Sequence, residues 1–281
     1  MKEEEREMSF LDHLEELRWH IVRSLAAIVI FMVASFIGAK WVFQNIIFAI
    51  GRPDFITFKW LCKIGEATGF EDSLCITEIP FKIQSRYMMG QFTMHLTSSF
   101  IMGLILAFPY VAWEIWRFIK PGLHVTERKY SRGAVASISF LFFLGISFGY
   151  YVMSPLAVYF LSSYQISDMI SNEFDITSYV STIATLVMGS GVLFQLPVVV
   201  YFLSQVGLVT PKLMRQYRKH AIVIILIVAA IITPPDPLSQ TLIGLPLLVL
   251  YEFSIYISAI VVRRKAKREA AELAEEAAQK S

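Results

Sequence analysis

Six long, uncharged and largely apolar stretches alternate with polar segments along the chain. They lie at about 24–39, 87–113, 133–167, 176–211, 221–235 and 237–262, and only Glu252 interrupts the last of them. A helix needs about 20 apolar residues to cross the hydrocarbon core of a bilayer. Open strands cannot cross it, because their backbone polar groups would stay unpaired in lipid. The pattern therefore predicts an all-α membrane protein with six transmembrane helices.

The last two helices are expected to be short. Residues 221–233 lead into the sequence Thr233-Pro-Pro-Asp-Pro237. They would extend about 20 Å at 1.5 Å per residue, against a hydrocarbon core of about 30 Å. A short helix pair must thin the bilayer, bury its ends in protein or contact a partner. Two other stretches contain prolines: we expect Pro155 to end or bend the third helix and Pro197 to kink the fourth.

The polar segments divide the chain into two predicted regions. Residues 1–262 form the six-helix transmembrane domain, and residues 263–281, rich in Ala, Glu, Lys and Arg, form a charged cytoplasmic tail. Apolar residues at helical spacing predict an amphipathic helix over about 8–22, which leads into the first span. Residues 46–86 form the longest polar connection and are expected to be a long outer loop.

Composition and charge place the chain in a membrane and orient it. The sequence is 56% hydrophobic, well above the share of a soluble domain. Lys and Arg gather before the first stretch, between the second and third, between the fourth and fifth, and after the sixth. The second outer connection carries Asp168, Glu173 and Asp175 but no Lys or Arg. By the positive-inside rule, both termini are expected to be cytoplasmic.

The chain offers little catalytic chemistry. It shows no Gly-rich phosphate loop, nucleophile elbow or metal-ligand cluster, and its five histidines have no HExxH-type spacing. We therefore expect no enzyme activity, no cofactor, no metal and no nucleic-acid partner. Two carboxylate-bearing stretches, Ser9–Arg18 and Phe118–Arg128, instead adjoin membrane spans on the predicted cytoplasmic face. Acidic groups in that place favour binding of a basic ligand.

Several motifs are similar to those of one family. The sequence His13-Leu-Glu-Glu-Leu-Arg18, before the first span, resembles the amino-terminal signature of TatC, the multispanning receptor of the twin-arginine protein translocase. Phe118-Ile-Lys-Pro-Gly-Leu and Glu127-Arg128 resemble its first cytoplasmic loop. Phe194-Gln-Leu-Pro197 resembles its fourth span, and Thr233-Pro-Pro-Asp-Pro-Leu-Ser-Gln240 its last outer turn. The matches cover nearly the whole chain in order.

The resemblance implies a receptor in the bacterial cytoplasmic (inner) membrane that binds signal peptides with two consecutive arginines. Such a receptor assembles with single-span partners of the TatA and TatB type, is expected to associate with itself, and carries folded proteins across the bilayer using the proton-motive force. The alternative is a secondary transporter of small solutes. Transporters tend to show inverted repeats and paired intramembrane charges, whereas this chain shows no repeat and few intramembrane charges.

Glu16 and Glu127 are the predicted ligands of the signal peptide. A carboxylate matches the planar fork of a guanidinium, and two adjacent arginines need two separate acceptors. Three further residues are expected to position the helix and the loop: Arg18, Phe118 and Arg128. The alternative is local pairing, in which Glu16 pairs with His20 one turn later and Glu127 with its neighbour.

A second predicted set serves partner docking or polar contacts inside the membrane: Gln195, Thr233, Asp236, Gln240 and Glu252. Gln195 stands where the family often has Glu, and its alternative role is a helix–helix hydrogen bond of about 0.6–2 kcal/mol. For Asp236 and Gln240 the alternative is capping of the sixth helix. Glu252 is ionisable and lies deep in an apolar stretch, which is typical of a functional or locally paired group.

Cys62 and Cys75 both lie in the long outer loop and are not among the features that carry the resemblance. A disulfide between them would brace the loop and contribute about 3 kcal/mol in the chain-entropy model. The alternative is two free thiols, because the sequence does not show whether the two Cβ atoms approach within bonding reach.

Overall fold

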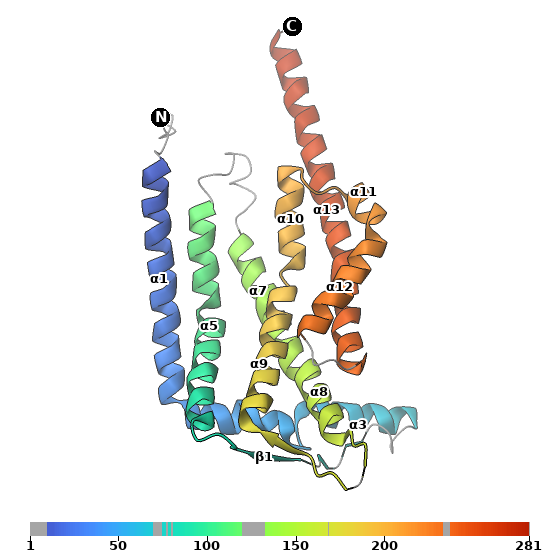
Figure 1. The fold of residues 1–281 in the computed structure, drawn as a ribbon. Coiled ribbons are helices and arrows are strands. Elements are labelled where there is room, and N and C mark those ends of the chain that lie inside the picture. Colours follow the sequence, from blue (N-terminus) through green and yellow to red (C-terminus); the bar gives the residue numbers. More distant parts are fainter. Residues whose placement is uncertain are drawn as a thin grey trace. The chain divides into compact units, whose positions relative to one another are not determined.

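The computed structural model describes residues 10–69, 75–76, 78–79, 81–119, 133–167, 169–232 and 237–280, and they are mostly helical (Figure 1). The elements are α1 Phe10–Ile37, α2 Ala39–Val42, η1 Phe43–Ile47, η2 Phe48–Gly51, α3 Ile56–Thr68, β1 Lys82–Gln84, α5 Gly90–Ile119, α7 Ala134–Phe148, η4 Gly149–Met153, α8 Ser154–Ser163, β2 Glu173–Asp175, α9 Ile176–Leu193, α10 Leu196–Val206, α11 Pro211–Gln216, α12 Arg218–Ile232 and α13 Pro237–Lys280. The chain divides into two compact units. The first contains Met1–Phe48, Gln84–Phe140 and Asp175–Val180, and the second contains Ala49–Ile83, Leu141–Phe174 and Ser181–Ser281.

Five helical segments of the described residues are long and apolar enough to cross a membrane: Leu14–Ile37, Gly90–Ile119, Ala134–Ser163, Ile176–Val206 and Ile243–Lys267. They correspond to the first, second, third, fourth and sixth predicted spans, so the prediction of a helical membrane protein is confirmed. The fifth predicted span is α12, which has 15 residues and a length of about 22 Å at 1.5 Å per residue. The six-span count and the cytoplasmic termini stay predictions.

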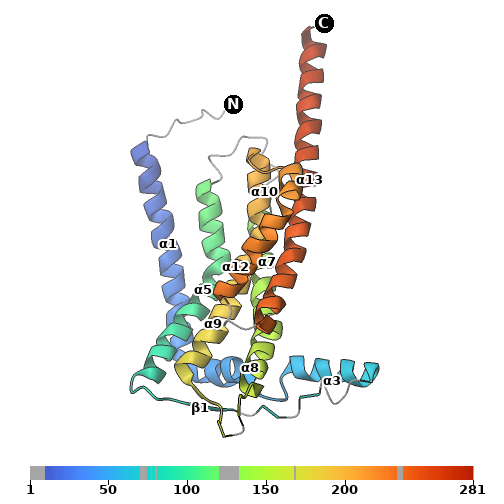
Figure 2. The same cartoon turned by 45° about the vertical axis from the view of Figure 1, so that its right-hand side comes forward.

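In the first unit, α1 and α5 run side by side (Figures 1 and 2). Their backbones approach closely at Gly103, where an added Cβ would lie 2.7 Å from the backbone nitrogen of Met32. Toward one end of the pair, a ring nitrogen of His95 lies 3.0 Å from the carbonyl oxygen of Phe36, and the two rings stack. Close backbone approach at small residues, with interhelical hydrogen bonds, is how helices associate in lipid.

Asp175 joins the end of β2 to the start of α9. Its carboxylate accepts hydrogen bonds from the backbone N–H groups of Arg86 and Thr177, each at 2.8 Å, and from the Thr177 hydroxyl. These donors, the Thr177 hydroxyl above all, hold the pKa of the Asp175 carboxyl below its ordinary value. The carboxylate thereby satisfies an orphan donor at the start of a membrane helix.

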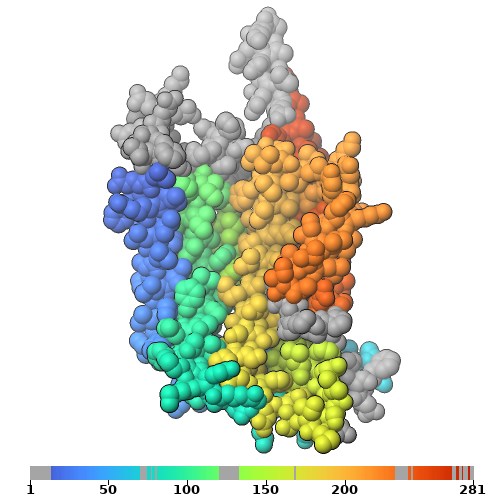
Figure 3. Space-filling model, viewed as in Figure 1, coloured from blue at the N-terminus to red at the C-terminus, as the bar shows by residue number. Residues whose placement is uncertain are grey.

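The second unit is built around α12 and α13, which pack against each other. Their buried core includes Met153, Leu186, Ala229 and Leu247. Gly145 permits close approach of α7 and α9, because a Cβ there would lie 2.6 Å from the carbonyl oxygen of Ser190. The segment of α11 and α12 is coloured orange in the space-filling view of Figure 3. The exposed apolar side chains of α12 are Ile222, Val223, Ile224, Leu226, Ile227 and Ile231.

Two predictions about helix ends can be compared with the structure. Of the two outcomes expected at Pro155, an end or a bend, the end is excluded: the helix continues to Ser163, and the π-helical turn η4 distorts it directly before the proline, which accommodates the missing proline N–H. The sixth predicted helix is not short, because α13 has 44 residues and contains a 25-residue candidate span. Its tail is rich in Ala, Glu, Lys and Arg, which favour helix and offer no stop.

Two other predicted segments, the long polar connection and the fourth span, can also be compared with the structure. The long polar connection over 46–86 contains the 13-residue helix α3, which begins at Ile56 and ends where Gly69 adopts a left-handed conformation with φ of 77°. Glycine tolerates that conformation without the penalty of a side chain. The fourth predicted span is interrupted at Phe194 and Gln195, just before Pro197, so α9 and α10 are separate helices. The expected disturbance near Pro197 is therefore present.

Candidate functional site

A buried carboxylate links α1 and α5 in the first unit. The side chain of Glu114 on α5 is 1% exposed, and one of its oxygens pairs with Nδ1 of His20 on α1, whose side chain is 6% exposed. Arg23, one turn further along α1, places a guanidinium nitrogen 3.6 Å from the same oxygen. The hydroxyl of Tyr110 donates a 2.9 Å hydrogen bond to the other oxygen. These four residues are called the Glu114 cluster below.

The cluster follows from helical spacing on both sides. His20 and Arg23 are three residues apart on α1, and Tyr110 and Glu114 are four apart on α5, so each pair shares one helix face. An isolated carboxylate in an apolar interior is costly. Here the Arg23 guanidinium, the His20 ring and one hydroxyl offset that cost, which is the usual condition for an ionisable group inside a membrane helix pair.

Glu16 lies one turn before His20 and faces the same imidazole. Its Oε1 atom is 4.0 Å from Nε2 of His20, and its side chain is 39% exposed. The i,i+4 pair that the sequence offered as an alternative is therefore present, although it is long. The other carboxylate oxygen, Oε2, is buried and has no hydrogen-bond partner among the described residues. Glu16 thus keeps one acceptor oxygen available.

The other residues that the sequence predicted for signal-peptide recognition do not all lie beside Glu16. Arg18 does not pair with Glu16 in the described structure: its guanidinium lies 3.5 Å from Glu15, and both side chains are exposed. Phe118 lies edge-on to the ring of His20, with the ring centroids 6.0 Å apart. Glu127 and Arg128 fall in 120–132, outside the described residues. The structure therefore brings both Glu16 and Phe118 next to His20.

The three described members of the second predicted set, Gln195, Gln240 and Glu252, lie in different local environments. Glu252 pairs with Arg218 of α12 at 2.6 Å, and both side chains are about half exposed. The side-chain amide of Gln240 donates to the carbonyl oxygen of Leu226 at 3.2 Å, so it links α13 to α12. Gln195 is the residue before α10 and makes no side-chain cap of that helix. The other two members, Thr233 and Asp236, lie outside the described residues.

Cys62 on α3 and Cys75 are joined by a disulfide, with their Cα atoms 4.2 Å apart. Glu66 lies one turn after Cys62, and its carboxylate belongs to the same small group of potential metal ligands. The disulfide uses both thiols, so this group offers a metal only the carboxylate. The bond ties the helix of the predicted outer loop to the chain that follows it, which is the bracing role that the sequence suggested.

Sequence reasoning missed the Glu114 cluster. From the sequence, Glu114 near the end of the second predicted span could either reach toward the interface or pair with a neighbouring group, and His20 was not singled out as its partner. The signal was available, because a Glu in the apolar run of α5 needs a cation, and α1 carries His20 and Arg23 three residues apart at similar depth. What the sequence did not show is that these faces of α1 and α5 meet.

The helices and the paired charges define a multi-pass helical membrane protein with a polar site at the end of its first two spans. Comparison with known proteins makes the assignment specific. The model of the family "Sec-independent protein translocase protein (TatC)" matches residues 12–246. The chain belongs to the TatC family.

Individual relatives agree over almost the full length. A Sec-independent protein translocase protein TatC of Blattabacterium sp. subsp. Periplaneta americana is 39% identical over 94% of this chain and 100% of its own. The TatC protein of Halalkalibacterium halodurans is 33% identical over 94% of each chain. A crystal structure of the twin arginine translocase receptor TatC has a TM-score of 0.65 and 29% identity, covering 88% of this chain and 97% of that one. A second crystal structure of this receptor, in DDM, has a TM-score of 0.69 and 28% identity, covering 88% of this chain and 99% of that one.

Proposed function

We propose that this chain is the signal-peptide receptor of a twin-arginine translocase in the bacterial cytoplasmic membrane. In this proposal it binds twin-arginine signals at its cytoplasmic face, and it works with single-span partners to move folded proteins using the proton-motive force. Family membership and the similar receptor structures support this function. The observation that carries the binding role is the buried, unpartnered Oε2 of Glu16 among the described residues.

Glu16 has the chemistry that an arginine requires. A buried acceptor without a partner costs about 1–3 kcal/mol, and more when it is charged. An arriving guanidinium would relieve that cost and donate two parallel hydrogen bonds to one carboxylate. His20 already holds Oε1 at the long distance of 4.0 Å, so the carboxylate is oriented without being saturated. Phe118, whose ring lies edge-on to that of His20, also contacts this histidine. We propose Glu127 as the acceptor of the second arginine.

The proposal is tested by peptide binding to the purified protein. A fluorescent peptide with two consecutive arginines should bind, and the same peptide with two lysines should bind more weakly, because an ammonium lacks the planar fork. Glu16→Gln should lower the affinity about tenfold, the effect of one charge-assisted bond partly screened at a wet surface. Glu15→Gln is the matched control, since Glu15 neighbours Glu16 but lies exposed beside Arg18. Equal affinities for Glu16→Gln, Glu127→Gln and the unaltered chain would refute the proposal.

We further propose six spans, with α12 as a short fifth span that contacts a single-span partner. At about 22 Å its 15 residues fall short of a hydrocarbon core of about 30 Å. Exposed Val223, Ile227 and Ile231 recur at helical spacing along it and offer an apolar face. The Gln240–Leu226 hydrogen bond ties α12 to α13. The neighbouring helix therefore holds α12, which carries this apolar face, in place. Both termini would then lie in the cytoplasm.

A further inference from the structure

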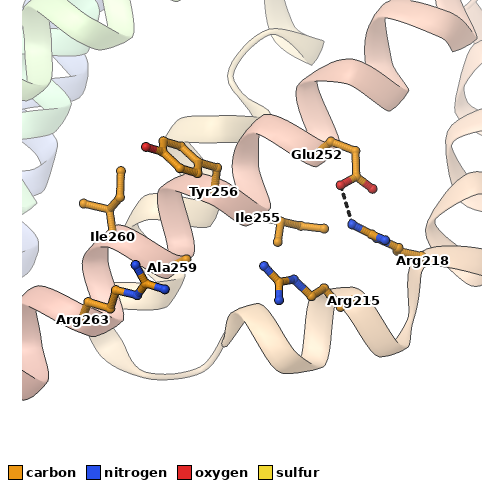
Figure 4. A pocket seen from close by; sticks show the side chains of 8 residues that line it. All are labelled: Arg215, Arg218, Glu252, Ile255, Tyr256, Ala259, Ile260 and Arg263. Carbon is orange, nitrogen blue, oxygen red and sulfur yellow. Dashed lines mark hydrogen bonds and ion pairs between the residues drawn. The ribbon is translucent and has the colours of Figure 1, made fainter.

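A basic cavity lies between α11, α12 and α13 in the second unit (Figure 4). It has a volume of about 380 Å³. Three arginines from three different helices line it: Arg215 of α11, Arg218 of α12 and Arg263 of α13. In Figure 4 the side chain of Arg215 rises from its helix between those of Arg263 and Arg218. The cavity therefore gathers the guanidinium groups of Arg215 and Arg218, three residues apart, with that of Arg263 from much later in the chain.

The cavity carries uncompensated positive charge. Among the described residues that line it, the acid is Glu252, which is paired with Arg218 at 2.6 Å. Arg215 and Arg263 have no ion-pair partner in the part of the chain that the structure describes. Two guanidiniums facing one cavity repel each other, and an anion between them removes that repulsion. Guanidinium forks match phosphate oxygens in pairs, so a phosphate fits this charge and geometry better than a small halide does.

The other wall of the cavity is apolar. Ile255 and Tyr256 belong to α13 and line it beside the arginines. Tyr256 is exposed, and exposed Phe253 and Val249 continue the same face of α13 at spacings of three and four residues. This face lies within the candidate span Ile243–Lys267, where it would meet acyl chains. The ligand that suits the cavity is thus anionic at one end and apolar at the other.

We propose that this cavity binds the phosphate of an anionic glycerophospholipid, with the acyl chains lying along the exposed face of α13. Arg215 and Arg263 hold the phosphate, and Glu252 keeps Arg218 at the rim. Basic pockets between membrane helices on the cytoplasmic side are known to bind anionic head groups. The charge of the cavity repels an arginine-bearing peptide, so this site is separate from recognition at Glu16.

The test measures lipid retention by the full-length protein in detergent, using native mass spectrometry. Phosphatidylglycerol should be retained in preference to phosphatidylcholine, whose choline would face the arginines. Arg215→Gln and Arg263→Gln should each lower retention roughly fivefold, as expected for one arginine at a membrane surface. Arg264→Gln is the control, because Arg264 is the exposed neighbour of Arg263 and does not line the cavity. Unchanged retention in the double variant overturns the proposal.

Two further measurements keep the test decisive. Inorganic phosphate should displace phosphatidylglycerol only weakly, because it lacks the apolar contacts; equal affinity would mean a free-anion site and overturn the lipid assignment. A photoactivatable phosphatidylglycerol added to the unaltered protein should label the segment around Tyr256. This measurement does not depend on whether any variant folds. Labelling confined to α1 and α5 would place the lipid elsewhere and also overturn the proposal.

Discussion

The Glu114 cluster makes one prediction that the structure allows to be worked out in detail. The perturbation is Glu114→Gln, which keeps the size of the side chain and removes its negative charge. The amide oxygen can still accept the hydrogen bond of Tyr110, now 2.9 Å from a Glu114 oxygen. The carboxylate that the His20 ring and the Arg23 guanidinium contact is lost, and with it the counter-charge of Arg23. We expect the change to destabilise the α1–α5 pair.

The magnitude follows from burial. Removing one partner of a buried ion pair costs about 3–5 kcal/mol. The His20 side chain is almost completely buried, so losing the Glu114–His20 contact should cost a free energy close to that range. Arg23 is partly exposed, and water replaces much of its interaction with Glu114. Because the amide retains the Tyr110 hydrogen bond, we expect the lower end, about 3 kcal/mol. That is more than a hundredfold in the unfolding equilibrium, at about 1.4 kcal/mol for each factor of ten.

The assay is equilibrium unfolding of the purified protein in mixed micelles, followed by circular dichroism. Glu15→Gln is the matched control, because its partner Arg18 and the carboxylate itself are both exposed, and such pairs contribute about 0–1 kcal/mol. In a His20→Gln background, Glu114→Gln should cost much less, and the difference gives the coupling between the two side chains. The reasoning is refuted if Glu114→Gln and Glu15→Gln shift unfolding equally, or if the two substitutions at 20 and 114 are additive.

Three further predictions concern other parts of the chain. Cys62 and Cys75 should resist alkylation under denaturing, non-reducing conditions and react only after reduction; two labelled thiols without a reductant would contradict the disulfide. Asp175 has a lowered pKa in the folded state, so its stabilising contribution is complete above the ordinary carboxyl pKa of about 3.9 and is lost as the pH falls below it. Asp175→Asn should lower the unfolding temperature at pH 7 and make no difference near pH 2. Photocrosslinkers at Val223 and Ile227 should capture single-span partners, and capture only from α5 would count against docking on α12.

The sequence predicted the helices better than their ends. Apolar runs located all of the candidate spans, because the demand for about 20 apolar residues in lipid is local and strict. At Pro155 the helix is distorted and does not end, because the π-helical turn η4 removes the conflict between the proline and the turn before it. The sixth helix is longer than expected because the tail rich in Ala, Glu, Lys and Arg, which favours helix, continues it without a break.

The candidate site was predicted in part. Glu16 stands out in the sequence as an acidic residue just before the first span, and its contact with His20 follows from helical spacing, whereas its role in recognition stays a prediction. For Glu114 the sequence left open whether it reaches the interface or pairs with another group, and the structure shows the pairing. Its burial depends on which face of α5 meets α1, and the sequence of either helix alone does not determine that pairing.

The Glu114 cluster bears on the recognition proposed at Glu16, because it fixes how α1 and α5 pack against each other. Gly103 lets α1 and α5 approach closely, but apolar contacts alone would tolerate a shift of one helix along the other. A shift of one turn, about 5.4 Å, would leave Glu114 buried without its cations, so the ionic contact penalises every register but one. His20 is fixed by that contact, and Glu16 lies one turn before it on the same helix. The buried pair therefore sets the position of the carboxylate proposed to bind arginine, although the pair itself need never touch the peptide.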